Sequence, residues 1–259
     1  MTQTAFLTSA AVGHAGAASP VQVGLTGAGR PHRLPRSRAG AALIAAHAGL
    51  FIVTLGVLDT AIGWPDVLRE PPAVVFERIG AAALATKLGY SSYLLSSLLM
   101  VPIAFLARDL MRRAGGVGSW VDSLAFFGAA AGVLKAIGIT RWLMTMPALA
   151  GLHAAAPDEA SRQAVQAVYV GLNAYGGSIG ELLGVQLFSG VWFAGVSGAL
   201  LALGGHRISG GLGLVVAALT LALAGRPFLP QLGALEMVAG PLWLVWLLVL
   251  AGVLARGRA

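Results

Sequence analysis

The sequence predicts an all-α protein, a polytopic bundle of about six transmembrane helices. Two observations carry this prediction. Apolar residues make up 57% of the 259 residues and charged residues only 10%, whereas soluble domains contain roughly 45–50% apolar and about 25% charged residues. Stretches without formal charge also recur at about 20 residues, the length that a helix needs to cross roughly 30 Å of hydrocarbon. This composition excludes an ordinary soluble enzyme.

Residues 1–38 differ from the rest of the chain and are predicted to form a flexible, basic cytoplasmic tail. They contain no acidic residue and end in four arginines, Arg30, Arg33, Arg36 and Arg38. They also lack the apolar periodicity that a packed core requires. A secretory signal carries its basic residues before its apolar run. Because the order is reversed here, we expect no signal peptide, and residues 39–259 form the membrane domain.

The six predicted spans follow in order from the end of this tail. All are mainly apolar, and they cover residues 39–58, 88–107, 121–147, 179–203, 208–224 and 237–255. The second span contains Pro102, which transmembrane helices tolerate. Among the predicted spans, only the third and the fourth contain formal charges. An even number of spans places both termini on one side of the membrane.

Two long loops, residues 60–87 and 151–178, join spans on the opposite side. Each is predicted to hold a short interfacial helix, formed by the partly apolar residues 74–84 in the first loop. In the second loop, Asp158 can cap a helix that begins after it. An unbroken helix from there to the end of the fourth span would be about 70 Å long, more than twice the hydrocarbon core. We therefore expect a break at Gly176-Gly177-Ser178.

The distribution of basic residues predicts that both termini are cytoplasmic. Lys and Arg near span ends are retained in the cytoplasm, and the terminal side of this topology carries ten of the seventeen basic residues, against six on the opposite side. The opposite side also holds most of the acidic residues. Because retention explains the net charge of +7, we expect the lipid bilayer as partner and no nucleic acid.

Three charges inside the spans mark a candidate polar site. Lys135 lies about two thirds of the way across the third span, Arg141 lies near its outer boundary, and Glu181 enters the fourth span at a similar depth. Such residues are costly in hydrocarbon unless they are paired or hydrated. Depth predicts a contact between Arg141 and Glu181. The pair is either part of an outward-facing polar pocket or a structural ion pair, with Lys135 snorkelling to the headgroups.

Small residues predict that the third and fourth spans approach closely. Glycines recur four residues apart, which places them on one face of each helix. They are Gly128 and Gly132 on the third span and Gly176, Gly180 and Gly184 on the fourth.

No motif predicts catalysis, a cofactor or a metal site. The chain has no cysteine, which excludes thiolate ligands and cysteine nucleophiles. The pattern around Ser197 matches that of rhomboid proteases, but the sixth span lacks the histidine that would take the serine proton. None of the five histidines is spaced with a second ligand. His47, inside the first span, is expected to be a hydrogen-bonded interior residue.

The third and fourth spans also resemble a known family. The residues that carry this resemblance are Gly138-Ile139-Thr140-Arg141-Trp142, Pro147-Ala148-Leu149-Ala150, Asp158, Ala160-Ser161-Arg162, Tyr175-Gly176, Gly180-Glu181-Leu182-Leu183-Gly184 and Trp192. They resemble the bacterial polytopic membrane proteins of domain-of-unknown-function family 4386. The resemblance covers about residues 39–255 and implies about six helices in a bacterial membrane, with no established activity. It implies that Asn173, which stands where family members have His, and Tyr175 lie at the lip of the site.

The sequence thus predicts a noncatalytic, multi-pass protein of the bacterial cytoplasmic membrane. Its candidate polar site comprises Lys135, Arg141, Asn173, Tyr175 and Glu181. Two alternatives stay open, a protein that binds or transports a small solute or ion, and an intramembrane enzyme. A membrane-protein partner is also possible under the noncatalytic interpretation.

Overall fold

The computed structural model describes residues 36–115, 118–203 and 206–257. The described residues contain helices and no strand, which confirms the predicted all-α class. In chain order the helices are α1 (Arg38–Ile62), η1 (Asp66–Arg69), α2 (Pro72–Ala81), α3 (Ala83–Arg113), α4 (Ser119–Leu143), α5 (Thr145–Ala154), α6 (Glu159–Gly177), η2 (Ser178–Phe188), α7 (Ser189–Ala202), α8 (Arg207–Leu223), η3 (Pro230–Leu235) and α9 (Glu236–Arg256). The predicted tail, residues 1–38, lies almost wholly outside the described residues.

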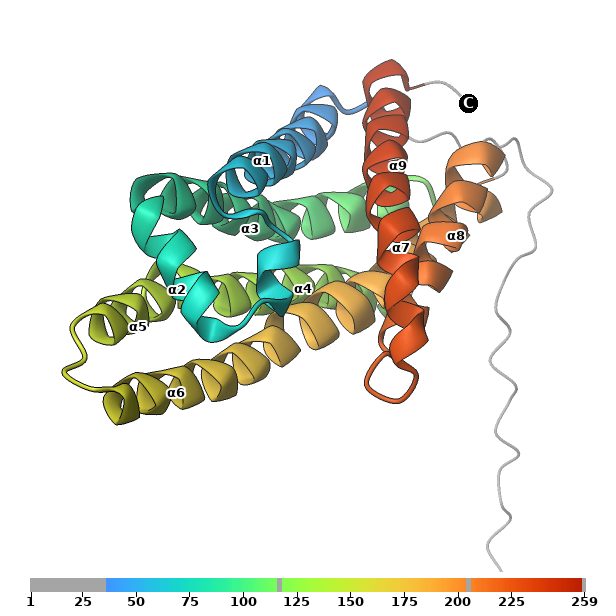
Figure 1. The fold of residues 1–259 in the computed structure, drawn as a ribbon. Helices are drawn as coiled ribbons and strands as arrows, with labels where there is room; N and C mark the ends of the chain where they lie inside the picture. Colours follow the sequence, from blue (N-terminus) through green and yellow to red (C-terminus); the bar gives the residue numbers. More distant parts are fainter. Residues whose placement is uncertain (1–35, 116–117, 204–205, 258–259) are drawn as a thin grey trace, which may run out of the picture. The chain divides into compact units, whose positions relative to one another are not determined.

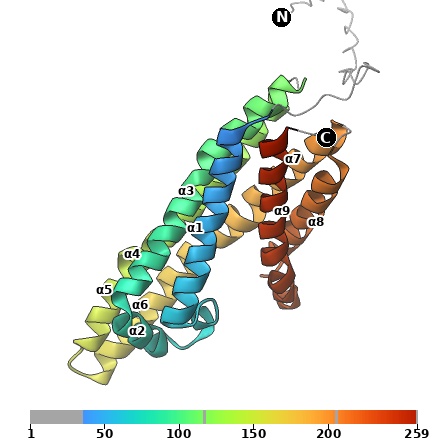
Figure 2. The same ribbon diagram turned by 90° about the horizontal axis from the view of Figure 1, so that it is seen from above.

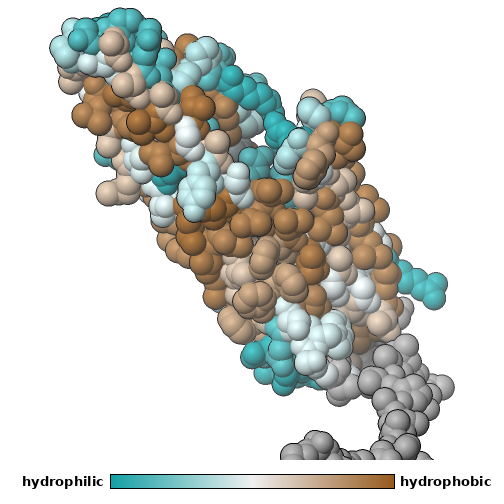
Figure 3. Space-filling model, turned by 90° about the horizontal axis from the view of Figure 1, so that it is seen from below, coloured by the Kyte–Doolittle hydropathy of each residue, from teal (hydrophilic) through white to brown (hydrophobic). Residues whose placement is uncertain are grey.

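Five helical stretches are long and apolar enough to cross a membrane. They cover Arg38–Ile62, Ala83–Arg113, Ser119–Ala154, Glu159–Ala202 and Pro230–Arg256. The predicted fifth span corresponds to α8, which has 17 residues and is therefore about 25 Å long. Figure 3 shows apolar side chains in a broad middle zone of one face, between hydrophilic side chains at its two ends. The chain is therefore a multi-pass membrane protein whose sides suit lipid contact.

The helices run between two ends of the bundle. At one end, here called the terminal end, the start of α1 meets the end of α9, where the Ser37 amide donates to the Leu254 carbonyl at 2.9 Å. At the other, here called the loop end, α2, α5 and α6 gather beside one another (Figures 1 and 2). A buried core lies in each half, around Trp192 and Trp246 toward the terminal end and around Trp142 and Met146 toward the loop end.

The predicted break after the second long loop is wrong. The helix that begins at Glu159 continues through Gly176-Gly177-Ser178 to Ala202, and at Ser178 it changes from α-helical to π-helical geometry. The helix stays intact because its small residues pack directly on α4. A Cβ atom built on Gly180 would lie 3.1 Å from the Gly138 Cα atom, so the two backbones touch there. A 44-residue helix is about 66 Å long, and its first part therefore projects beyond the hydrocarbon.

The predicted packing glycines divide between two interfaces. Gly176, Gly180 and Gly184 face α4, as expected of the fourth span. On α4, however, Gly132 faces the Ser97 carbonyl of α3, and Gly128 lies between Trp192 of α7 and Ala104 of α3. The glycine of α4 that meets η2 is Gly138, which the four-residue spacing did not single out.

Helix α6 begins at the predicted cap. Asp158 has extended backbone geometry, and its Oδ1 atom accepts a hydrogen bond of 2.8 Å from the Ser161 amide. This hydrogen bond lowers the pKa of Asp158 below its usual value of 3.8, because it favours the charged carboxylate. The short loop between α5 and α6 therefore ends in a capped helix, as the sequence predicted.

The cap makes the start of α6 sensitive to acid. Since the pKa of Asp158 is lower in the folded state, its stabilising contribution is complete above the unfolded-state pKa and is lost as the pH falls through the folded-state pKa. We expect faster amide exchange at Ser161 in Asp158→Ala than in the unchanged protein at neutral pH. Asp158→Asn, which caps without a charge, retains protection, and its exchange lacks the acid-dependent loss. Equal exchange in all three proteins contradicts the prediction.

Candidate functional site

The five predicted site residues separate into distinct locations. Arg141 and Asn173 are in direct contact near the loop end. Glu181 lies with charges from the α8–α9 connection, and Lys135 is buried between helices. The Tyr175 side chain is 71% exposed and points to the surface. Of the predicted set, the structure therefore brings together only Arg141 and Asn173.

Arg141 stands in the last turn of α4 and reaches across to α6. Its Nε atom donates to Asn173 Oδ1 at 3.2 Å, and its Nη1 atom donates to the Gly138 carbonyl at 2.5 Å. The guanidinium carbon lies 5.6 Å from the centre of the Trp142 ring, which suits a cation–π contact. Gly176 leaves the space for this side chain, since a Cβ atom there would lie 2.7 Å from the Arg141 Cδ atom.

The Arg141 guanidinium has no ion-pair partner among the described residues. A guanidinium has five N–H donors, and two of them account for the hydrogen bonds to Asn173 and Gly138. Both acceptors are neutral. The side chain is half-buried, so its positive charge is only partly solvated and is not balanced by a carboxylate in contact.

Three tyrosines also lie in the neighbourhood of the Arg141 charge. Tyr90 stacks on Trp142 with ring centres 5.0 Å apart and an angle of 10° between the rings. Tyr90, Tyr93 and Tyr169 all lie within electrostatic range of Arg141. Among the described residues, the buried hydroxyls of Tyr90 and Tyr169 have no hydrogen-bond partner. A small anion at the guanidinium could accept hydrogen bonds from such hydroxyls.

The predicted contact between Arg141 and Glu181 is wrong. Glu181 is 3.6 Å from Arg226, and Arg226 is also 2.5 Å from Glu236. Arg69 pairs with Glu236 at 3.2 Å and so joins η1 to the same network. Arg141 and Glu181 still lie within electrostatic range of each other. Glu181 turns instead toward the α8–α9 connection, because α8 packs against η2.

Lys135 occupies a separate, interior position on α4. It is only 7% exposed, so its side chain stays inside the bundle and does not snorkel to the surface. Gly184 of η2 lies against it, because a Cβ atom on Gly184 would be 2.9 Å from the Lys135 amide nitrogen. No ion pair of Lys135 occurs among the described residues. It lies within electrostatic range of His47 of α1.

His47 is a buried, hydrogen-bonded residue, as the sequence predicted. Its Nδ1 atom lies 2.7 Å from the Ser96 carbonyl oxygen of α3. Its ring also meets Trp243 of α9 edge-on, with centres 5.4 Å apart. The sequence did not connect it with Lys135, because depth along two helices does not reveal which faces meet.

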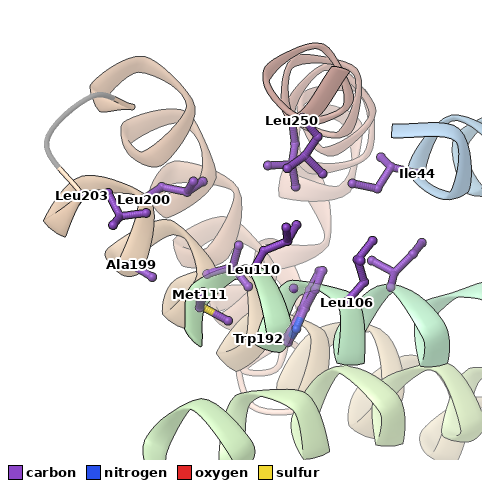
Figure 4. A pocket seen from close by; sticks show the side chains of 13 residues that line it. Ile44, Leu106, Leu110, Met111, Trp192, Ala199, Leu200, Leu203 and Leu250 are labelled. Carbon is purple, nitrogen blue, oxygen red and sulfur yellow. The ribbon is translucent and has the colours of Figure 1, made fainter. Parts of the chain in front are cut away.

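The bundle also contains a small apolar cavity toward the terminal end. Figure 4 shows side chains of α1, α3, α7 and α9 converging on it, among them Ile44, Leu110, Trp192 and Leu250. Its volume is about 40 Å³, and none of its lining residues is titratable. The cavity therefore offers apolar contact only.

Among the described residues, no group of three or more His, Asp and Glu side chains could hold a metal ion.

Comparisons with known proteins found no match for this chain. None of the protein-family models, curated proteins or solved structures compared with this chain matches it.

Proposed function

We propose that the protein is a noncatalytic membrane protein that binds a small anion at Arg141. The anion is of the carboxylate or phosphate class, because a guanidinium fork matches two oxygens of such a group. The observation that carries this proposal is the half-buried guanidinium without a carboxylate in contact. The buried, unpartnered hydroxyls of Tyr90 and Tyr169 lie within electrostatic range of this guanidinium.

The proposed setting is the bacterial cytoplasmic membrane, crossed six times with both termini in the cytoplasm. The hydrogen bond between Ser37 and Leu254 supports an even number of crossings, with α8 as the shortest span. The surplus of arginine at the terminal end supports its cytoplasmic location. The loop end then faces outward, and Arg141 lies at the outer boundary. Membership of domain-of-unknown-function family 4386 is part of the same proposal.

The alternative that Arg141 serves only as a structural ion pair has less support. Its hydrogen-bond acceptors are an amide and a carbonyl, whereas the ion pairs at this end of the bundle use Arg69, Arg78, Arg162 and Arg226. Arg69, Arg78 and Arg226 join η1, α2 and the α8–α9 connection without Arg141. The architectural role is therefore filled by other residues, which leaves the Arg141 charge for a ligand.

The proposal predicts that acetate or inorganic phosphate stabilises the protein against heat. A ligand that binds only the folded state stabilises by about 2.7 kcal/mol at 100 times its Kd, and each kcal/mol raises Tm by roughly 2–4 °C in a chain of this size. We expect this rise in lipid nanodiscs, relative to chloride at equal ionic strength. Arg141→Gln removes the rise, and Arg141→Lys weakens it because lysine lacks the planar fork.

Arg162→Gln is the matched control, since Arg162 is a half-buried arginine of α6 that is paired with Glu159. It keeps the full response to acetate and phosphate. An equal response in Arg141→Gln and the unchanged protein would overturn the proposed site. No response of the unchanged protein to either anion would overturn the proposed ligand class.

A further inference from the structure

Two buried basic side chains of the described bundle, Lys135 and His47, have no acid in contact with them. All ten acidic residues of the chain are described, and those of α3 and α4, Asp109 and Asp122, pair with arginines at the terminal end. Glu181 pairs with Arg226. Lys135 forms no ion pair among the described residues, and it lies within electrostatic range of His47. A buried cation without a counter-ion calls for another acceptor.

The hydrogen bonds of His47 fix its tautomer. The Ser96 carbonyl, 2.7 Å from His47 Nδ1, can only accept a hydrogen bond, so Nδ1 must carry the proton. The Ser96 hydroxyl donates in turn to the His47 carbonyl at 3.0 Å. The Nε2 atom of the neutral ring is therefore a bare acceptor. It is buried and has no hydrogen-bond partner among the described residues.

Lys135 and His47 flank the same turn of α3. His47 contacts Ser96, and the next residue, Ser97, meets Gly132 of α4, where a Cβ atom would lie 2.6 Å from the Ser97 carbonyl. Lys135 is one helical turn beyond Gly132 on the same face of α4. The other side chains around the pair are uncharged, since Gly184 backs Lys135 and Trp243 covers the His47 ring.

The bare Nε2 atom decides what these groups bind. An anion beside Lys135 would meet the lone pair of His47, which repels it, whereas an N–H or O–H donor is attracted. The ammonium of Lys135 is a donor only. We propose that Lys135 and His47 form an interior proton-binding site, in which the Lys135 ammonium donates to His47 Nε2 through one water.

This site holds a single proton between two bases. When the proton moves, an Nζ–H bond breaks as the water takes that proton, and a water O–H bond breaks as the Nε2–H bond forms, so the pair keeps one positive charge throughout. A second proton would place two positive charges in an interior without a nearby acid, and the loss of the only proton leaves a neutral pair. The site thus exchanges one proton with its surroundings, the behaviour of an intramembrane proton-transfer station. It is independent of anion binding at Arg141.

The composition of the chain permits a direct test, because Lys87 and Lys135 are its only lysines and it has five histidines. The full-length protein is labelled with ¹⁵N-histidine and ¹⁵N-lysine and studied by NMR in nanodiscs, with His47→Gln assigning the ring signals. We expect His47 to be the Nδ1–H tautomer, with an Nε2 resonance shifted by an accepted hydrogen bond. Lys135→Met moves that resonance to the position of a nitrogen without a hydrogen bond. The exposed Lys87→Met leaves it unchanged.

The titration supplies a second readout. As the pH rises, the Lys135 Nζ and His47 Nε2 resonances should change together in one transition, and His47→Gln should shift the Lys135 transition. Lys135→Met is expected to fold, because methionine replaces an uncompensated buried charge with an apolar chain of similar length. The effect of His47→Gln is measured on the resonance of Lys135. An Nε2–H tautomer, or an Nε2 resonance that Lys135→Met leaves in place, would overturn the proposal.

Discussion

Replacing Trp192 with alanine lowers the free energy of unfolding by about 3–5 kcal/mol. The Trp192 side chain is fully buried and packs between Gly128 of α4, Phe193 and Trp246. Lipid tails are as apolar as the bundle interior, so hydrophobic transfer contributes little to helix association. The loss comes instead from van der Waals contacts that no other atoms replace. Unfolding in detergent micelles, followed by circular dichroism, measures it.

The matched control is Phe126→Ala, an aromatic residue of α4 that is 62% exposed. It should cost much less, because lipid or detergent refills the space. The cavity of Figure 4 already adjoins Trp192, so the truncation enlarges a void that is lined by apolar side chains. Such voids bind small aromatic molecules, and indole should restore part of the Tm of Trp192→Ala only. Equal losses in the two variants contradict this account.

The bundle could be predicted because lipid imposes a length on every crossing. The charge-free stretches identified α1, α3, α4 and α9, although α1, α3 and α9 extend past the predicted spans at both ends and α4 ends at Leu143, before the predicted end at residue 147. Helix α3, for example, reaches Arg113, whereas the predicted span ends at residue 107. Hydropathy marks the edge of the hydrocarbon, but a helix continues into the headgroups because its backbone hydrogen bonds are internal. The same reasoning explains the unbroken helix through Ser178.

The candidate site could be predicted only in part, because the sequence indicates how deep a side chain lies in the membrane but not the direction in which it points. Depth placed Arg141 and Glu181 at one level, but the rotation of each helix decides which side chains meet. A π-helical segment such as η2 turns successive residues by a smaller angle than an α-helix does, and Glu181 lies within it. Its partner Arg226 comes from a connection far along the chain. No spacing rule in the sequence connects the two.

The contact between α4 and η2 depends on Gly138, which the spacing of glycines in the sequence did not single out. Gly138→Leu tests that contact. A Cβ atom on Gly138 would lie 2.6 Å from the Gly180 Cα atom and 3.0 Å from the Gly176 carbonyl oxygen. These are backbone atoms, which cannot rotate away as a side chain does. Overpacking costs about 1–3 kcal/mol and occasionally more. We expect about 3 kcal/mol or more for leucine, and a smaller loss for alanine, in the same unfolding measurement.

Gly151→Ala on α5 is the control, because no atom lies within 4 Å of the added Cβ atom. Alanine at an open helix position should be neutral or stabilise by up to about 1 kcal/mol. Gly138 also helps to position Arg141, because the Gly138 carbonyl and Asn173 of α6 both accept hydrogen bonds from the Arg141 guanidinium. Separation of α4 from α6 and η2 should therefore weaken the Tm response to acetate in Gly138→Ala. If Gly138→Ala matches Gly151→Ala in stability, the two backbones are not in contact, and the glycine does not position Arg141.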